Sequence, residues 1–274
     1  MRMPSGSSRQ KVALLVSAAM LAAACADSGS TSEPHREAPR WPTLMSDLHF
    51  AWSAEPGIDL FSGAAVVIRA YQESLTAAAY GGNNEYLYPG FDNAVAPNQP
   101  QGSPRSTRAL WPELGFPLER PLVGTFRNHI LHVNTAGPNT SVTVCDWLWG
   151  AARQQPDGKF LSGTSWRAAP GVSVSRYTLA TPPSTDSTAQ QPQRGPSLFA
   201  INNVFGKWRV IGRITATDSI AAGPEWPEFD QDLAACAAKA PESEERRQFL
   251  TTGEHPRSDF PTLPAYPGWP AESQ

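Results

Sequence analysis

The sequence predicts an α+β domain in which one long helix packs on a curved, cone-like antiparallel sheet. Three observations carry this prediction. Apolar residues recur at helical spacing between 58 and 80, a period-two pattern with turn residues runs from 122 to 215, and the chain then changes to short helices and prolines. We therefore expect a domain over residues 45–220 and a C-terminal extension over 221–274.

The expected helix covers Ile58–Tyr80. Its buried face is a stripe of apolar residues at steps of three and four: Leu60, Ala64, Val67, Ile68, Tyr71, Leu75 and Ala78. Gly81-Gly82 ends the helix, because glycine adopts the left-handed conformation common after helix ends. Residues 83–118 carry proline, asparagine and glycine with scattered aromatics, which predicts a long ordered loop with a short helical turn.

Strands are expected wherever polar and apolar residues alternate. They are Val123–Asn134, Ser141–Ala152, Val172–Thr181, and a hairpin of Ser197–Val204 with Lys207–Thr215. The second strand is apolar on both faces, so both faces should be covered. Alternation puts Asp146 on the opposite face from Cys145 and Trp147. We expect the long helix to cover the Asp146 face and the C-terminal extension to cover the other.

The C-terminal extension begins with a proline-containing turn and continues as a helix over Phe229–Ala240, with a further helical turn over Ser243–Leu250. In residues 257–274, aromatic and apolar residues recur every third position between four prolines, which is typical of a polyproline segment laid along a surface. This segment either wraps the domain or frays.

The first 24 residues have the layout of a secretory signal. Arg2, Arg9 and Lys11 precede an apolar run from Val12 to Ala24 that is broken only by Ser17. A helix of that length covers about 20 Å, which is too short for a bilayer core of roughly 30 Å. Residues 25–44 are rich in serine, proline and glutamate without apolar periodicity, which predicts a disordered tether.

Cys25 directly follows small residues, in the sequence Leu-Ala-Ala-Ala-Cys, and this resembles the lipobox of bacterial lipoproteins. The resemblance implies that Cys25 is acylated, becomes the new N-terminus, and holds the protein to the extracytoplasmic side of the cell membrane. The alternative is an ordinary secretory signal cleaved near Ala22–Ala24, which would release a soluble protein.

Composition restricts the function classes. Removing the signal leaves 19 basic and 25 acidic residues, a net charge near −6, which gives no electrostatic reason to bind nucleic acid. The 18 arginines against 4 lysines, with many alanines and prolines, indicate a high-GC genome, and we expect an actinobacterial origin.

The sequence contains no Gly-x-Ser-x-Gly elbow, phosphate loop or His-Glu-x-x-His motif, so no catalytic residue and no cofactor is expected.

Two cysteines remain once Cys25 carries lipid. In an exported protein, Cys145 and Cys236 are expected to form a disulfide; two buried free thiols are the alternative. The closed loop of about 90 residues would stabilise the fold by roughly 4 kcal/mol. No metal site is expected, because His129 and His132 lie three apart in a strand and should therefore point to opposite faces.

The order of one helix and several antiparallel strands, ending in Gly206-Lys207-Trp208-Arg209-Val210, resembles the ketosteroid isomerase and nuclear transport factor 2 superfamily. The resemblance covers about residues 58–215 and implies a cone-shaped fold with a pocket. The chain departs from the family in lacking a clear second helix between Gly82 and Leu122. A lipocalin-like or other β-sandwich is the alternative fold.

Asp146 is the one candidate for pocket chemistry. The resemblance implies that such an aspartate acts as a general base, with Tyr71 on the helix and His129 on the sheet completing a ligand-binding site. The alternative is a buried ion pair with Arg127 or Arg176, since buried carboxylates are usually paired. We expect a non-catalytic envelope lipoprotein that binds a small apolar ligand or an envelope protein. An enzyme of the ketosteroid isomerase type is the alternative.

Overall fold

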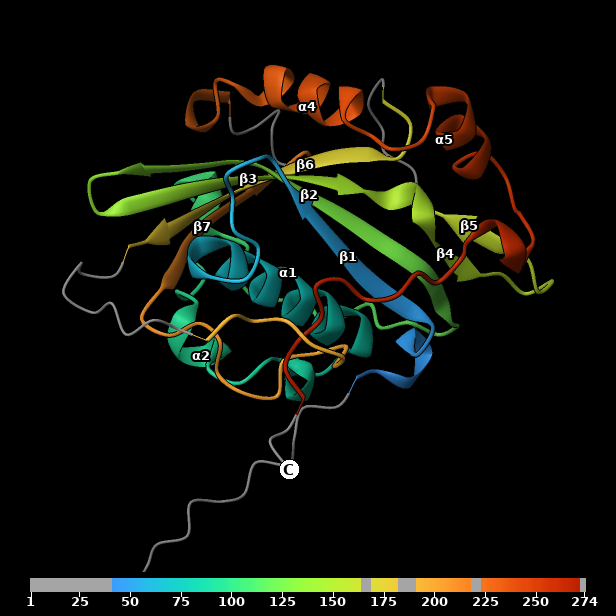
Figure 1. Ribbon diagram of the computed structural model, residues 1–274, viewed down its shortest axis with the longest axis horizontal. Coiled ribbons are helices and arrows are strands. Elements are labelled where there is room, and N and C mark those ends of the chain that lie inside the picture. Colours follow the sequence, from blue (N-terminus) through green and yellow to red (C-terminus); the bar gives the residue numbers. More distant parts are fainter. Residues whose placement is uncertain (1–40, 164–168, 182–190, 218–222, 272–274) are drawn as a thin grey trace, which may run out of the picture. The chain divides into compact units, whose positions relative to one another are not determined.

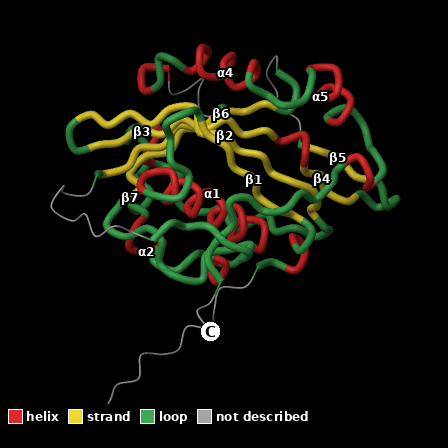
Figure 2. The backbone as a smooth tube through the Cα atoms, in the orientation of Figure 1, coloured by secondary structure: helices red, strands yellow, loops and turns green. Residues whose placement is uncertain are grey.

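The computed structural model describes residues 41–163, 169–181, 191–217 and 223–271. The predicted signal and the predicted lipidation site, Cys25, lie outside these residues. Contacts group residues 38–274 into one compact unit. This unit is a mixed α/β structure, compatible with the predicted α+β class, in which helices lie on both faces of one sheet (Figures 1 and 2).

The described sheet has seven strands in the order β5-β4-β2-β3-β6-β7, with β1 pairing beside β2. All pairs are antiparallel except β1 with β2, which is parallel. The strands are β1 (Leu48–Ala54), β2 (Leu122–Ala136), β3 (Asn139–Trp147), β4 (Ala151–Gln154), β5 (Phe160–Ser162), β6 (Val172–Ala180) and β7 (Arg209–Thr215).

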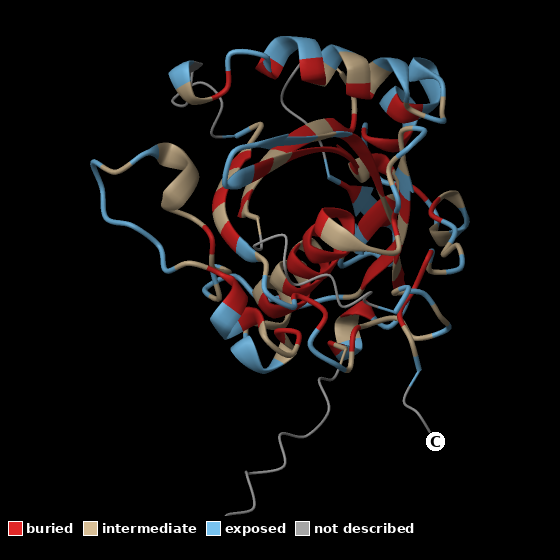
Figure 3. Ribbon diagram, turned by 60° about the vertical axis from the view of Figure 1, so that its left-hand side comes forward, coloured by how far each residue is buried: buried red, intermediate tan, exposed pale blue. Residues whose placement is uncertain are grey.

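The helix α1 (Gly63–Gly81) covers one face of the sheet and is buried along most of its length (Figure 3). It ends at Gly82, whose φ of 66° is the left-handed conformation that the glycine pair predicted. The short α2 (Phe91–Ala94) follows. On the other face lie α4 (Phe229–Ala238) and α5 (Glu244–Leu250), whose outer sides are exposed (Figure 3). None of the described helices is both long and apolar enough to span a bilayer.

The strand predicted over Ser141–Ala152 is interrupted. Both halves of this segment pair with β2: Ala151 of β4 lies opposite Gly124, and Trp147 of β3 lies opposite Arg127. Three residues separate Trp147 from Ala151, whereas two separate Gly124 from Arg127. The extra residue forms a bulge between β3 and β4. Gly124 has a φ of 99°, and a Cβ there would lie 2.2 Å from the carbonyl oxygen of Gly150. The bulge therefore depends on glycine at position 124.

Two strands escaped prediction and one predicted strand is wrong. β1 carries a period-two signal in Leu48, Phe50 and Trp52, all buried, and this signal could have identified it. β5 has only three residues and gives no such signal. The predicted Ser197–Val204 strand is not formed; there, the Asn203 side chain accepts the Phe205 N–H at 3.0 Å and makes a turn instead of a ladder.

The C-terminal segment wraps the domain. Tyr266 pairs with Ala51 at the free side of β1, and Trp269 pairs with Ser197. Phe260 and Trp269 are buried. Of the two outcomes that the polyproline pattern allowed, the described residues show the wrapped one.

A polar network inside α1 fastens this segment. The buried Arg69 donates to the carbonyls of Leu60 at 2.8 Å, Gln193 at 3.0 Å and Gly268 at 2.7 Å. The buried Glu73, one turn later, accepts bonds from three ring donors: Trp52 at 2.8 Å, Tyr88 at 3.0 Å and Trp269 at 2.6 Å. Neutral donors thus satisfy a carboxylate that the core would otherwise penalise heavily.

Candidate functional site

Asp146 lies on β3 and faces α1, as alternation predicted. Its carboxylate accepts a hydrogen bond from Gln72 Nε2 at 2.7 Å and another from Ser175 Oγ at 2.6 Å. Tyr177 in turn donates to Gln72 Oε1 at 3.2 Å. The aspartate is therefore held within a small polar cluster between β3, β6 and α1.

Burial sets the protonation of this aspartate. Desolvation raises the pKa of Asp146 above its ordinary value, and the hydrogen bonds from Ser175 and Gln72, with the charge of Arg213, lower it by less. The alternative, an ion pair of Asp146 with Arg127 or Arg176, is not formed. Arg127 bonds Glu242 at 2.6 Å and Arg176 bonds Glu228 at 3.1 Å, because both arginines point to the α4 face rather than to α1.

The three residues expected to share a pocket are not brought together. Tyr71 packs in the helix-side core, where its hydroxyl donates to the Leu110 carbonyl at 2.7 Å and its ring stacks on Phe91. Burial raises the pKa of Tyr71 to about 12. His129 lies opposite Cys145 in the sheet register and therefore on the α4 face, away from Asp146.

Gln72 and Ser175 are the polar partners that sequence analysis missed. Gln72 had a signal, because it lies four residues after Ile68 and three before Leu75, within the apolar stripe of the helix. A polar residue on a buried stripe needs a partner, and Asp146 is that partner. Ser175 is one of many small polar residues in the predicted strands, and no sequence pattern marked it as a partner of Asp146.

The predicted disulfide joins Cys145 of β3 to Cys236 of α4, with the Cα atoms 5.2 Å apart and a sequence separation of 91. Next to it, Trp147 Nε1 donates to the Cys236 carbonyl at 3.1 Å and Trp149 Nε1 donates to Glu242 at 2.9 Å. The C-terminal extension thus covers the Cys145 face of the sheet, as expected.

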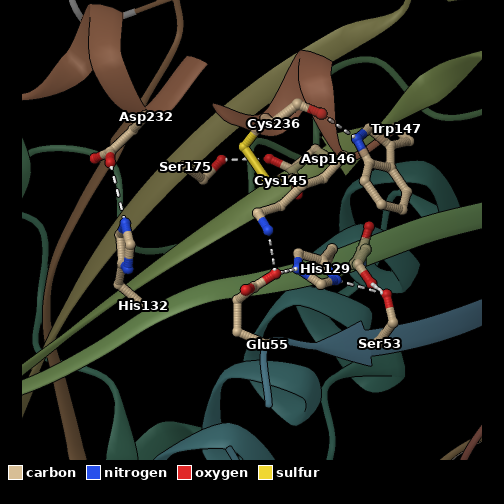
Figure 4. Close-up of a disulfide and its surroundings, with 12 residues drawn as sticks. Ser53, Glu55, His129, His132, Cys145, Asp146, Trp147, Ser175, Asp232 and Cys236 are labelled. Atoms are coloured by element: carbon tan, nitrogen blue, oxygen red, sulfur yellow. Dashed lines mark hydrogen bonds and ion pairs between the residues drawn. A yellow bond between two sulfur atoms is a disulfide. The ribbon is translucent and has the colours of Figure 1, made fainter. Parts of the chain in front are cut away.

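A second polar cluster lies beside this disulfide (Figure 4). His129 is in hydrogen-bond contact on one ring nitrogen with Ser53 Oγ at 2.9 Å, and on the other with Glu55 Oε1 at 2.9 Å. Lys239, just after α4, contacts the same Glu55 oxygen at 2.7 Å. Serine, histidine and carboxylate in this order form an arrangement that can activate a hydroxyl. Ser53 and Glu55 lie at the end of β1, the strand that escaped prediction.

The two histidines of the His-x-x-His pair share a face, contrary to expectation. The register of β2 against β3 shifts between Ile130 and His132, and the extra residue turns His132 toward α4, where it lies 3.5 Å from Asp232. Each histidine has its own carboxylate partner. Within the described ranges, no group of three or more potential ligands is placed to hold a metal ion.

An open hollow of about 850 Å³ lies near β4 and β5. Apolar side chains on its lining include Phe126, Leu148, and the exposed Phe116 and Leu161, with exposed fractions of 81 % and 39 % for the last two. Arg120, Arg153 and Glu119 also line it, together with polar side chains such as Gln154. The hollow thus combines apolar side chains with two cations and one carboxylate.

Comparison with protein families, with curated proteins and with solved structures finds no match to this chain.

Proposed function

We propose that this protein is a cell-envelope lipoprotein, held at the extracytoplasmic side of the membrane through Cys25, that works by binding a small apolar ligand. The lipobox-like end of the signal supports the anchor. The hollow beside β5 supports the ligand, since single exposed apolar residues are ordinary but two lining one cavity favour a binding site.

The observation that supports ligand binding is that apolar and cationic side chains line the same hollow. Phe116 and Leu161 offer apolar surface to solvent, and Arg120 and Arg153 lie in the same lining, where they outnumber the single carboxylate, Glu119. This combination suits an acyl chain that ends in an acidic group, because the chain buries apolar surface while a guanidinium binds the carboxylate.

A fluorescent fatty acid, dansyl-undecanoic acid, tests the ligand. Phe116→Ser should weaken its binding about tenfold, because the bound acyl chain would no longer cover the Phe116 ring. The loss of that apolar contact costs at least about 1.4 kcal/mol of binding free energy. Phe249→Ser is the control, because Phe249 is also an exposed phenylalanine, at 47 %, but lies on α5 and does not line the hollow. If the native protein did not bind the fatty acid, or if both variants lost the same affinity, the proposed ligand would be wrong. An envelope protein would then be the expected partner.

Intact mass tests the anchor. The native protein should begin at Cys25 and carry acyl chains, and Cys25→Ala should abolish both the added mass and membrane retention. A lipid-free chain beginning near Ala22–Ala26 would contradict the anchor without affecting the ligand.

We propose as a finer description of the fold that α1 and the sheet form the cone of the ketosteroid isomerase and nuclear transport factor 2 superfamily. The raised pKa of Asp146 favours that family's base chemistry as a second function. Against it, Asp146 is buried and held by Gln72 and Ser175. Turnover of a cyclic 3-ketosteroid that Asp146→Asn removes would favour the enzyme; absence of turnover would leave the binding function.

A further inference from the structure

The cluster at the end of β1 has the connectivity of a nucleophile, a base and an orienting carboxylate. Ser53 is exposed, His129 is 8 % exposed, and the Glu55 side chain is 30 % exposed. The histidine thus lies between a serine open to solvent and a carboxylate, with 2.9 Å on each side. Both distances are within hydrogen-bond reach, as the activation of a hydroxyl requires.

The charge of Glu55 decides which ring nitrogen carries the proton. Hydrogen bonds from Lys239 and then His129 hold the pKa of Glu55 below its ordinary value, so the carboxylate is ionised at neutral pH and can only accept. His129 Nε2 must therefore carry the hydrogen that Glu55 accepts. In the neutral ring Nδ1 is then an acceptor, and the Ser53 hydroxyl donates to it at 2.9 Å, a shorter contact than its alternative, the Asn128 carbonyl at 3.4 Å.

The imidazole is fixed from several directions. Parallel pairing places Ser53 directly beside His129 in the sheet. The ring stacks on Trp147 at 5.6 Å between centroids and 16° between planes. Glu55 is held in turn by Lys239 of the disulfide-linked C-terminal extension. Such support from surrounding residues keeps a base aligned with its nucleophile.

The backbone supplies a donor next to the serine. The Glu55 N–H donates to Ile130 of β2, whereas the Trp52 N–H donates to Tyr266 on the other side of β1. Because N–H groups alternate along a strand, the Ala54 N–H points away from β2, to the side where the described sheet has no further strand. The N–H of the residue after a nucleophile is a common oxyanion donor.

We propose that Ser53, His129 and Glu55 form a surface acyl-transfer site that hydrolyses esters of short acyl chains. We expect a short acyl chain because Ser53 is exposed and meets its substrate directly from solvent. This inference goes beyond the proposed ligand binding and is independent of Cys25 and of the hollow.

The reaction runs in two balanced steps. Ser53 Oγ attacks the ester carbonyl carbon as its proton passes to His129 Nδ1; the carbonyl oxygen, negative in the intermediate, accepts the Ala54 N–H. The C–O bond to the alcohol then breaks, and His129 protonates the departing alkoxide. Water next attacks the acyl-serine and gives a proton to His129, and the acid leaves as Ser53 Oγ regains that proton.

A fluorophosphonate probe and p-nitrophenyl acetate, used on the intact protein, test the site. The probe should phosphonylate Ser53, identified by peptide mass, and Ser53→Ala should lower both labelling and acetate release at least 100-fold, to background. Glu55→Gln should cost about 100-fold or more, because the amide can donate to Nε2 and so leave the hydrogen on Nδ1, where it blocks the base.

Matched controls separate this site from general reactivity. Ser46→Ala removes an exposed serine, and His132→Gln removes a histidine with its own carboxylate on the same face. Neither should change labelling by more than twofold. Labelling of Ser53 no faster than that of Ser46, or undiminished in His129→Gln with its fold verified by circular dichroism, would overturn the proposal. Ser53 is exposed, so its alanine variant keeps the core intact.

Discussion

The two faces of the sheet treat their charged groups differently. On the α1 face, the carboxylates Glu73 and Asp146 are 2 % and 7 % exposed, and uncharged side chains satisfy both. On the α4 face, a disulfide links the sheet to α4, and the partly exposed carboxylates Glu55 and Glu242 meet cations. Asp232 is the exception on this face, because it is 6 % exposed and accepts a hydrogen bond from Trp226.

This contrast indicates where chemistry can occur. A buried carboxylate whose oxygens already accept hydrogen bonds cannot reach a substrate. Its role is structural, because its hydrogen bonds favour one particular packing of the core. A half-exposed carboxylate that orients a histidine beside an open serine can act on molecules from solution. Both candidate sites contain an acid, but only the α4 face brings one near solvent.

The largest effect should come from disrupting the α1 face at Glu73. Glu73→Ala leaves three ring donors without an acceptor and the charge of Arg69 uncompensated, so the free energy of unfolding should fall by about 3–5 kcal/mol. Urea denaturation measures this. Glu73→Gln keeps an acceptor oxygen and should lose less; equal losses would mean that the charge alone matters.

The second largest loss of stability should come from removing the disulfide on the α4 face. Replacing Cys145 and Cys236 together by alanine should cost about 4 kcal/mol, because the unfolded chain regains the freedom of a long loop. Hydrogen exchange should become much faster in α4 and change less in α1. Uniform acceleration in both helices would show that the two faces are one cooperative unit.

The smallest effect concerns the pH dependence of the buried acid. A raised pKa means that folded Asp146 binds its proton more tightly than unfolded Asp146 does. Its favourable contribution is therefore complete below the ordinary value of 3.8 and is lost as pH rises through the raised folded value. Across that window the free energy of unfolding of Asp146→Asn should rise relative to that of the native protein.

Urea midpoints at several pH values measure this gain. Asp230→Asn is the control, because Asp230 is exposed on α4 and should show no such trend. A native protein that instead gained stability relative to Asp146→Asn as pH rose would contradict the dominance of burial.

Periodic sequence patterns predicted the elements that depend on regular spacing. The α1 stripe, the strands β2 and β6, and both C-terminal helices lie close to their expected ranges. The bulges were not predictable, because one extra residue leaves alternation intact on either side. A single bulge at Leu131 accordingly reversed the prediction for His132. The Ser53 cluster required a parallel pairing between strands over 70 residues apart, and no local pattern specifies such a partner.

The network around Arg69 and Glu73 makes the packing of α1 depend on residues that are far away in the sequence. Arg69 donates to the carbonyls of residues 193 and 268, and Glu73 accepts a hydrogen bond from Trp269. Removing residues 268 and 269 would therefore take one hydrogen bond from each of these two buried groups. A substitution in the C-terminal segment can thus destabilise the centre of α1, although about 200 positions separate the two in the sequence.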